Sequence, residues 1–113
     1  TPRAPAEIQG GGGAGVWDGT ARGIARDGED VSQAFLSGAE QALALCKRHD
    51  IRVAILTEAS PSCGSSTLYD GSFTGHRVPG QGVTAALLER HGVRVFSQFE
   101  LDQAQRALQD SWE

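Results

Sequence analysis

The sequence lacks the features that several large classes of protein require. It has two cysteines in 113 residues, so we expect no disulfide framework, and a reducing cytoplasm is the default location. No apolar run approaches the roughly 18 residues of a membrane helix, so we expect no membrane span, and we expect no signal peptide. The 10 basic residues form no stripe among the 14 acidic ones, which argues against binding DNA. A structured RNA is not excluded, because a partner chain could supply positive charge.

The length bounds the domain organisation. A chain of 113 residues predicts a single domain. We expect residues 1–29 to form a proline- and glycine-rich connector with a short hairpin, and residues 30–113 to form an αβαβα core. The chain opens Thr1-Pro2-Arg3 without methionine, so we expect a processed product, a truncated form or the ordered part of a longer protein. The oligomeric state is left open, and a homodimer is compatible with the sequence.

The N-terminal quarter predicts little regular structure. Prolines at positions 2 and 5 disfavour a helix, so composition predicts a stiff, solvated tail over residues 1–9. Residues 10–15 fit the GxGxxG pattern of dinucleotide sites, but no strand precedes them, so a flexible loop is the better interpretation. Residues 16–24, with the turn dipeptide Asp18-Gly19, predict a hairpin that a second turn, Asp27-Gly28, brings to an end.

The remaining chain alternates helical and strand patterns. Asp30 is a good N-cap for the strongest helix, residues 31–49, and Cys46 falls on its apolar stripe as a buried hydrophobe. The other predicted elements are a strand at 51–57, an extended segment or loose hairpin at 68–80, a helix at 82–91, a strand at 93–96 and a last helix after the capping box Ser97-x-x-Glu100, with Leu101, Ala104 and Leu108 on one face. This alternation predicts the α/β class: a small Rossmann-like parallel sheet with flanking helices and a short hairpin. Two strands are few for such a sheet, so we expect that a first βα unit is absent.

The loop after the first strand is the best candidate for the functional site. In open α/β sheets, ligands bind outside the carboxyl ends of the strands. Residues 58–67 leave that end and carry one thiol, Cys63, among serines and a glycine. Backbone N–H groups in such a loop favour a thiolate. The hydroxyls and N–H groups of residues 60–67 suit, alternatively, a non-catalytic module that binds a small ligand or an anion.

The residues exclude some chemistries and leave others open. A phosphatase cradle, Cys-x5-Arg, fails because Tyr69 stands where arginine is required, and no GxSxG elbow of a serine hydrolase occurs. A cysteine nucleophile at Cys63, paired with His76, stays open. A metal site made by this chain alone lacks ligands at zinc-binding spacing. A shared iron–sulfur centre, with one thiolate from this loop and others from elsewhere, is the last alternative.

Four motifs in order along the chain carry a family resemblance. They are TPRAPAEI at 1–8, SPSCG at 60–64, YDGSFTG at 69–75 and GQGVTA at 80–85. With these motifs the sequence resembles the bacterial YbbK-like family, which includes the thiouracil desulfidases. The likeness covers almost the whole chain.

The resemblance implies an α/β enzyme that removes sulfur, without net redox change, from a thiolated pyrimidine such as thiouracil or from a 4-thiouridine base in tRNA. It implies a four-iron four-sulfur cluster held by three cysteines, of which Cys63 is the last, with the substrate sulfur at the open iron. By the same resemblance, Ser60 assists proton transfer, and Arg3, Glu7 and Ser62 contact the substrate. A net charge of −4 suits a small free pyrimidine better than tRNA.

The sequence also departs from the family pattern. The other two cluster ligands are expected in an N-terminal part, in a Cys-Leu-Leu-Gly-type and a Cys-Pro-Glu-type stretch, and neither is present. A catalytic glutamate expected in that region is absent too, and Cys46 cannot be assumed to replace any of these residues. We therefore expect that these 113 residues alone do not hold the cluster, and that they are either a fragment of an active desulfidase or a short form with another role.

Overall fold

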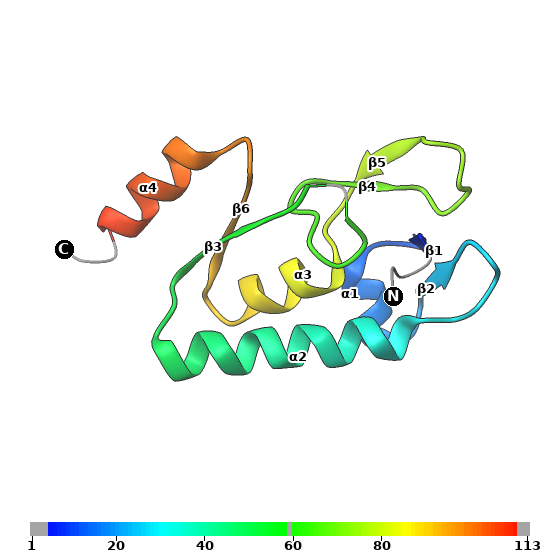
Figure 1. The fold of residues 1–113 in the computed structure, drawn as a ribbon, viewed down its shortest axis with the longest axis horizontal. Coiled ribbons are helices and arrows are strands. Elements are labelled where there is room, and N and C mark those ends of the chain that lie inside the picture. Colours follow the sequence, from blue (N-terminus) through cyan, green and yellow to red (C-terminus); the bar gives the residue numbers. More distant parts are fainter. Residues whose placement is uncertain (1–4, 59, 111–113) are drawn as a thin grey trace.

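Helices and strands alternate along the computed structural model, which describes residues 5–58 and 60–110 (Figure 1). The elements are β1 (Ala6–Gln9), α1 (Gly13–Asp18), β2 (Arg22–Ala25), α2 (Ser32–His49), β3 (Val53–Leu56), β4 (Thr67–Tyr69), β5 (Arg77–Pro79), α3 (Val83–Arg90), β6 (Arg94–Ser97) and α4 (Leu101–Asp110). The predicted extended segment at 68–80 forms the antiparallel hairpin β4–β5. Among the described residues, no helix combines the length and the apolar character needed to cross a membrane.

A two-stranded parallel sheet, β3 with β6, forms the centre of the fold. Its register pairs residues 53–56 with residues 94–97. Successive side chains of a strand point to opposite faces, so neighbouring residues of β6 enter different cores. Val95 packs with Leu88 of α3, whereas Phe96 packs with two buried alanines of α4. In Figure 1 the strands separate α4 from α2 and α3, and the predicted parallel α/β arrangement is confirmed.

The longest helix, α2, begins and ends where the sequence predicts. The predicted N-cap at Asp30 is wrong by one residue, because Val31 occupies that position and makes no side-chain cap bond. Asp30 still lies at the start of the helix, where its Oδ1 accepts the Ser32 N–H at 2.9 Å. Residues 47–49, Lys-Arg-His, occupy the last turn, where cations stabilise the negative end of the helix dipole. The predicted helix at 31–49 is confirmed to within one residue, and Cys46 is buried at 8% exposure, as expected of a small hydrophobe.

The N-terminal region is more ordered than the sequence predicts. The solvated tail is wrong for residues 6–9, because β1 pairs antiparallel with β2 and buries Ile8 to 2% exposure. The predicted hairpin at 16–24 is also wrong. Residues 13–18 form α1, so the glycine run is a loop only in its first half, and Gly19 ends the helix in the left-handed conformation at φ 86°. The dipeptide Asp18-Gly19 is typical of a helix end as well as of a hairpin turn, so the sequence at this point is compatible with both structures.

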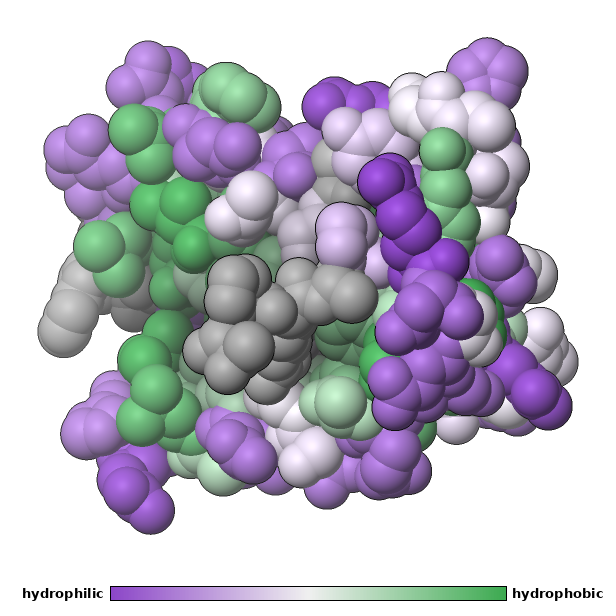
Figure 2. Space-filling view, turned by 45° about the vertical axis from the view of Figure 1, so that its right-hand side comes forward, coloured by the Kyte–Doolittle hydropathy of each residue, from purple (hydrophilic) through white to green (hydrophobic). Residues whose placement is uncertain are grey.

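The last helix, α4, begins as predicted but buries a different face. The capping box forms in part: Glu100 Oε1 accepts the Ser97 N–H at 2.9 Å, while the Ser97 hydroxyl accepts the N–H two residues on. Of the predicted apolar face, Ala104 is buried, but Leu101 and Leu108 are 57% and 45% exposed. Figure 2 shows apolar surface on the side of the molecule that carries α4.

Helix α3 begins against the loop that leaves β3. Its N-cap residue, Gly82, has no side chain to satisfy the first N–H groups of the helix. The carbonyl of Pro61 accepts the Val83 N–H at 2.9 Å, and the carbonyl of Ser62 accepts the Thr84 N–H at 2.7 Å. The loop backbone therefore caps the helix, and the helix in turn fixes the position of the loop.

This close approach makes Gly82→Ala a test of the fold. A Cβ atom at Gly82 would lie 2.5 Å from the carbonyl carbon and oxygen of Ser62 and 2.7 Å from the Cys63 nitrogen. Backbone atoms cannot swing aside as a side chain can, so we expect a loss of about 1–3 kcal/mol in the free energy of unfolding. Urea denaturation followed by circular dichroism measures this loss.

Gly38→Ala is the matched control for that substitution. Gly38 lies within α2, and a Cβ atom there meets nothing within 4 Å. Alanine is the better helix former, so this variant should gain roughly 0.5–1 kcal/mol in stability. Equal stabilities for the two alanine variants would contradict the packing of α3 against the loop.

Candidate active site

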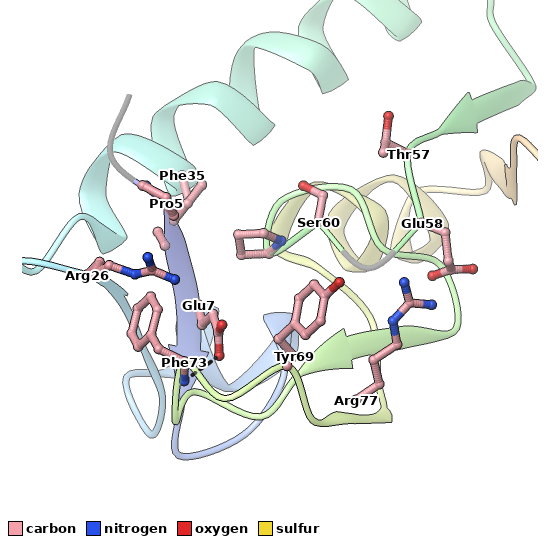
Figure 3. A pocket seen from close by; sticks show the side chains of 13 residues that line it. Pro5, Glu7, Arg26, Phe35, Thr57, Glu58, Ser60, Tyr69, Phe73 and Arg77 are labelled. Carbon is pink, nitrogen blue, oxygen red and sulfur yellow. Dashed lines mark hydrogen bonds between the residues drawn. The ribbon is translucent and has the colours of Figure 1, made fainter. Parts of the chain in front are cut away.

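A cavity of about 630 Å³ opens beside the carboxyl end of β3 (Figure 3). Its walls come from β1, the end of β2, the loop after β3 and the β4–β5 hairpin. The charged and aromatic side chains of these walls include Glu7, Glu58, Arg26, Arg77, Tyr69 and Phe73. This position is where open α/β sheets bind small molecules, and it adjoins the loop that the sequence singles out.

Glu7 lies in the cavity wall, and the substrate contact that the resemblance implies for it stays a prediction. One of its carboxylate oxygens, Oε1, accepts the Gly71 N–H at 2.9 Å and the Phe73 N–H at 3.2 Å. Gln9, on the same strand, donates its side-chain amide to the Gly71 carbonyl at 2.9 Å. The loop between β4 and β5 is thereby fastened to β1, and the other oxygen of Glu7 can accept from a ligand. Arg3, the second predicted contact of this motif, lies outside the described residues.

Two arginines lie against aromatic rings at the cavity. The guanidinium of Arg26 is 5.8 Å from the centroid of the Phe73 ring, and that of Arg77 is 5.4 Å from the centroid of the Tyr69 ring. Such cation–π contacts restrain both partners. A restrained ring beside a cation suits a flat, polar heteroaromatic ligand. Tyr69 and Phe73 belong to the motif at 69–75, but no sequence pattern marks Arg26 and Arg77 as their partners, because only the fold brings these arginines against the rings.

Ser60 also lines the cavity, at the start of the turn that leads to Cys63. Its Oγ accepts the N–H groups of Ser62 and Cys63, each at 3.2 Å. The hydroxyl oxygen is the acceptor in both bonds, so the hydroxyl hydrogen stays available to donate a hydrogen bond to a ligand. Figure 3 shows Ser60 and Glu7 on different walls of the same cavity, so the structure brings these two predicted residues together.

Ser62 and Cys63 are not among the residues that line this cavity. The Ser62 hydroxyl lies 2.8 Å from the hydroxyl of Thr84, at the start of α3. Cys63 is half-buried, and its thiol forms no disulfide. The predicted substrate contact at Ser62 therefore faces a helix in this structure, and the predicted ligand role of Cys63 stays a prediction.

The second thiol lies in a separate place. Cys46 packs with Leu88 and Val95, and burial raises the pKa of its thiol. It lines a different cavity, of about 340 Å³, near the ends of α2 and α3. In the parts of the chain that the structure describes, no group of three or more His, Cys, Asp or Glu residues is placed to hold a metal ion. Iron–sulfur clusters are held by cysteine thiolates, and the two thiols of this chain, Cys46 and Cys63, lie in different parts of the fold.

The structure gives no support to a nucleophile pair of Cys63 and His76. The His76 side chain is 85% exposed, and its Nδ1 lies 3.8 Å from Oδ2 of Asp70. The hydroxyl and then the N–H of Ser72 hold the pKa of Asp70 below its usual value, so this carboxylate is charged at neutral pH. His76 thus belongs to the exposed end of the β4–β5 hairpin, outside the residues that line the cavity.

Glu58 takes up the donors that an anion-binding loop would offer. Its Oε1 accepts the N–H groups of Ser65, Ser66 and Thr67 at 3.0, 3.1 and 3.1 Å. Its Oε2 accepts the hydroxyls of Ser65 and Ser66 at 3.1 and 2.8 Å. The anion-binding hypothesis for residues 60–67 relies on these groups, and in the structure the protein's own carboxylate binds them. The sequence does not predict this role for Glu58, because a glutamate close to several serines is equally typical of a solvent-exposed loop.

The fold and the cavity define an α/β protein with a cavity at the carboxyl end of a parallel strand, the place where proteins of this class bind small molecules. Residues 1–100 match the family profile described as 2-thiouracil desulfurase. The chain belongs to this 2-thiouracil desulfurase family, and the resemblance to YbbK-like proteins and thiouracil desulfidases is confirmed.

Two relatives place the chain more closely. YbbK of Bacillus subtilis, described as an uncharacterized protein, is 49% identical over 102 residues, which cover 90% of this chain and 68% of YbbK. Among solved structures, the 4Fe-4S-dependent thiouracil desulfidase TudS is similar, with a TM-score of 0.85 and 45% identity. That match covers 96% of this chain and 66% of TudS, so the chain spans about two thirds of the length of either relative.

Proposed function

We propose that this chain carries the substrate cavity of a desulfidase that removes sulfur from a thiolated pyrimidine of the thiouracil or 4-thiouridine type. Membership of the 2-thiouracil desulfurase family supports the reaction class. The observation that carries the proposal is the meeting of Glu7 and Ser60, far apart in the sequence, at one cavity with aromatic walls.

The cavity side chains suit distinct parts of this reaction. A flat pyrimidine stacks on Tyr69 or Phe73, beside the guanidinium groups that restrain these rings. The Glu7 carboxylate accepts a hydrogen bond from a ring N–H, which orients the base. The Ser60 hydroxyl relays a proton as the carbon–sulfur bond breaks. Water supplies the oxygen that replaces sulfur, and sulfur leaves as hydrogen sulfide, so no electrons are gained or lost.

The positions of the two thiols indicate which of them could be a ligand of an iron–sulfur cluster. TudS is described as 4Fe-4S-dependent, and such clusters are held by cysteine thiolates. Cys63 lies on the loop that borders the cavity, whereas Cys46 is buried in another core. We propose that Cys63 supplies one ligand and that the remaining ligands come from polypeptide outside these 113 residues. On this basis the 113-residue chain alone is inactive.

A free base is a better substrate for this cavity than a thiolated base within tRNA. The chain has a net charge of −4, which repels the phosphate backbone of a nucleic acid. Cavities of this size, about 630 Å³, commonly hold small heteroaromatic molecules.

Sulfide release from 2-thiouracil tests the proposal. The extended form is a fusion in which the N-terminal residues of YbbK that precede its match to this chain are placed before Thr1. After anaerobic reconstitution with iron and sulfide and then desalting, we expect the extended form to produce equal amounts of uracil and sulfide. The 113-residue chain should produce neither. A brown, folded extended form that leaves both 2-thiouracil and 4-thiouridine intact would contradict the proposed function.

A further inference from the structure

The loop at residues 58–67 is closed by the carboxylate of its own first residue. Glu58 lies two residues past the end of β3, and five donors from residues 65–67 meet its two oxygens. Two backbone bonds tighten the same loop: the Gly64 N–H donates to the Ser60 carbonyl at 2.8 Å, and the Gly82 N–H donates to the Gly64 carbonyl at 2.8 Å. Ser60 and Cys63 lie within the closed part of the chain.

The donors around Glu58 have the geometry of an anion site. Successive backbone N–H groups that converge on one point form a concavity that binds negative charge. Here three such groups meet one carboxylate oxygen, and two hydroxyls meet the other. Hydrogen bonds to a charged acceptor are stronger than neutral ones. These bonds join the beginning of the loop to its end, so they decide whether the whole segment is held.

We infer that Glu58 is a positioning residue: its carboxylate fills an anion site built by residues 65–67 and thereby sets the positions of Ser60 and Cys63 beside the cavity. We call this arrangement the Glu58 latch. Because the donors recognise carboxylate chemistry, an external carboxylate can occupy the site when the side chain is removed. The latch is inferred from the contacts of Glu58 and residues 65–67 and does not depend on the proposed function. Only the statement that it contributes to catalysis rests on the proposed function.

Glu58→Ala in the 113-residue chain tests the latch. We expect amide hydrogen exchange at residues 65–67 to rise at least about tenfold, because bonds to a charged acceptor are lost. Alkylation of Cys63 by iodoacetamide should rise severalfold, since the loop no longer holds the thiol. Added acetate should reverse both changes in this variant and leave the wild-type chain unaffected.

Two further variants and a reference thiol serve as controls. Glu58→Gln keeps the shape of the side chain but not its charge, so we expect a smaller rise in exchange and no response to acetate. Glu100→Ala removes a carboxylate that accepts the N–H of Ser97, the last residue of β6, so exchange should rise at Ser97 and not at residues 65–67. Cys46 is buried and its pKa is raised, so its slow alkylation reports an intact core.

The following results would overturn the inference about Glu58. Wild-type exchange at residues 65–67 in Glu58→Ala overturns the latch, and so does a rise that acetate does not reverse, because that rise would be general loosening. If Glu58→Ala unfolds, as fast alkylation of Cys46 would show, Glu58→Gln decides, and wild-type protection in that variant overturns the inference. None of these measurements needs turnover. An inactive extended form with an intact latch therefore counts against the proposed function alone.

Discussion

Cys63→Ser in the extended form is expected to abolish the brown absorbance of an iron–sulfur cluster and its bound iron. Thiolate is a soft ligand that iron–sulfur clusters require, and a serine hydroxyl is a poor replacement. The other thiol of the described chain, Cys46, is buried in a separate core, so it does not lie ready to take the place of Cys63. Visible absorbance and iron content after anaerobic reconstitution measure the loss.

Cys46→Ser is the matched control, because it also exchanges sulfur for oxygen in the same chain. Cys46 packs against apolar side chains at 8% exposure, so its replacement should lower stability and leave the colour intact. A Cys63→Ser protein that keeps its colour and iron would overturn the ligand assignment. Equal loss of colour in both variants would point to misfolding instead of ligation.

Ser60→Ala in the extended form is expected to lower kcat for 2-thiouracil by about 10²–10⁴-fold, the usual range for a lost proton-transfer group. The Ser60 hydroxyl lines the cavity, and alanine can pass no proton to the departing sulfur. Initial rates of sulfide release over a range of substrate concentrations separate kcat from KM. The cluster absorbance of the same sample shows whether the loop around Cys63 is still in place.

Ser60→Thr separates proton transfer from loop anchoring. The Ser60 oxygen also accepts the N–H groups of Ser62 and Cys63, so alanine loses an anchor as well as a proton. Threonine keeps the hydroxyl and should therefore keep most of the rate. A raised KM with unchanged kcat in Ser60→Ala would show substrate binding without proton transfer, which contradicts the assigned role.

Those parts of the fold that depend on local patterns could be predicted from the sequence. The 3.6-residue apolar period and the basic last turn identified α2, and apolar runs identified β3 and β6. The N-terminal region failed because its order comes from distant partners. Ile8 is buried in a cluster that includes Leu68 and Val83, far along the chain. Helix α1 packs so closely against the start of α3 that a Cβ at Gly13 would lie 2.2 Å from the Gly82 oxygen. No local window contains such information.

The candidate site likewise has residues that the sequence could identify and residues that only the fold reveals. Glu7 and Ser60 were identified through motifs of a known family, and the structure places both at the cavity. Phe73 belongs to the motif at 69–75, but its contact with Arg26 could not be foreseen, because this cation–π pair exists only once the end of β2 and the β4–β5 loop are neighbours. The role of Glu58 was hidden for a different reason: its partners are backbone N–H groups, which every residue has and no sequence pattern marks.

The edge of β3 bears on how this chain behaves when concentrated. Within the described residues, β3 pairs only with β6, and none of its residues is buried, whereas three of the four residues of β6 are. A strand with one unpaired edge offers its N–H and C=O groups to any extended chain that it meets. Its sequence, Val-Ala-Ile-Leu, is apolar and uncharged, which is the composition of segments that stack into fibrils. Aggregation through this edge is therefore the hazard to guard against whenever the chain is purified without a strand to cover it.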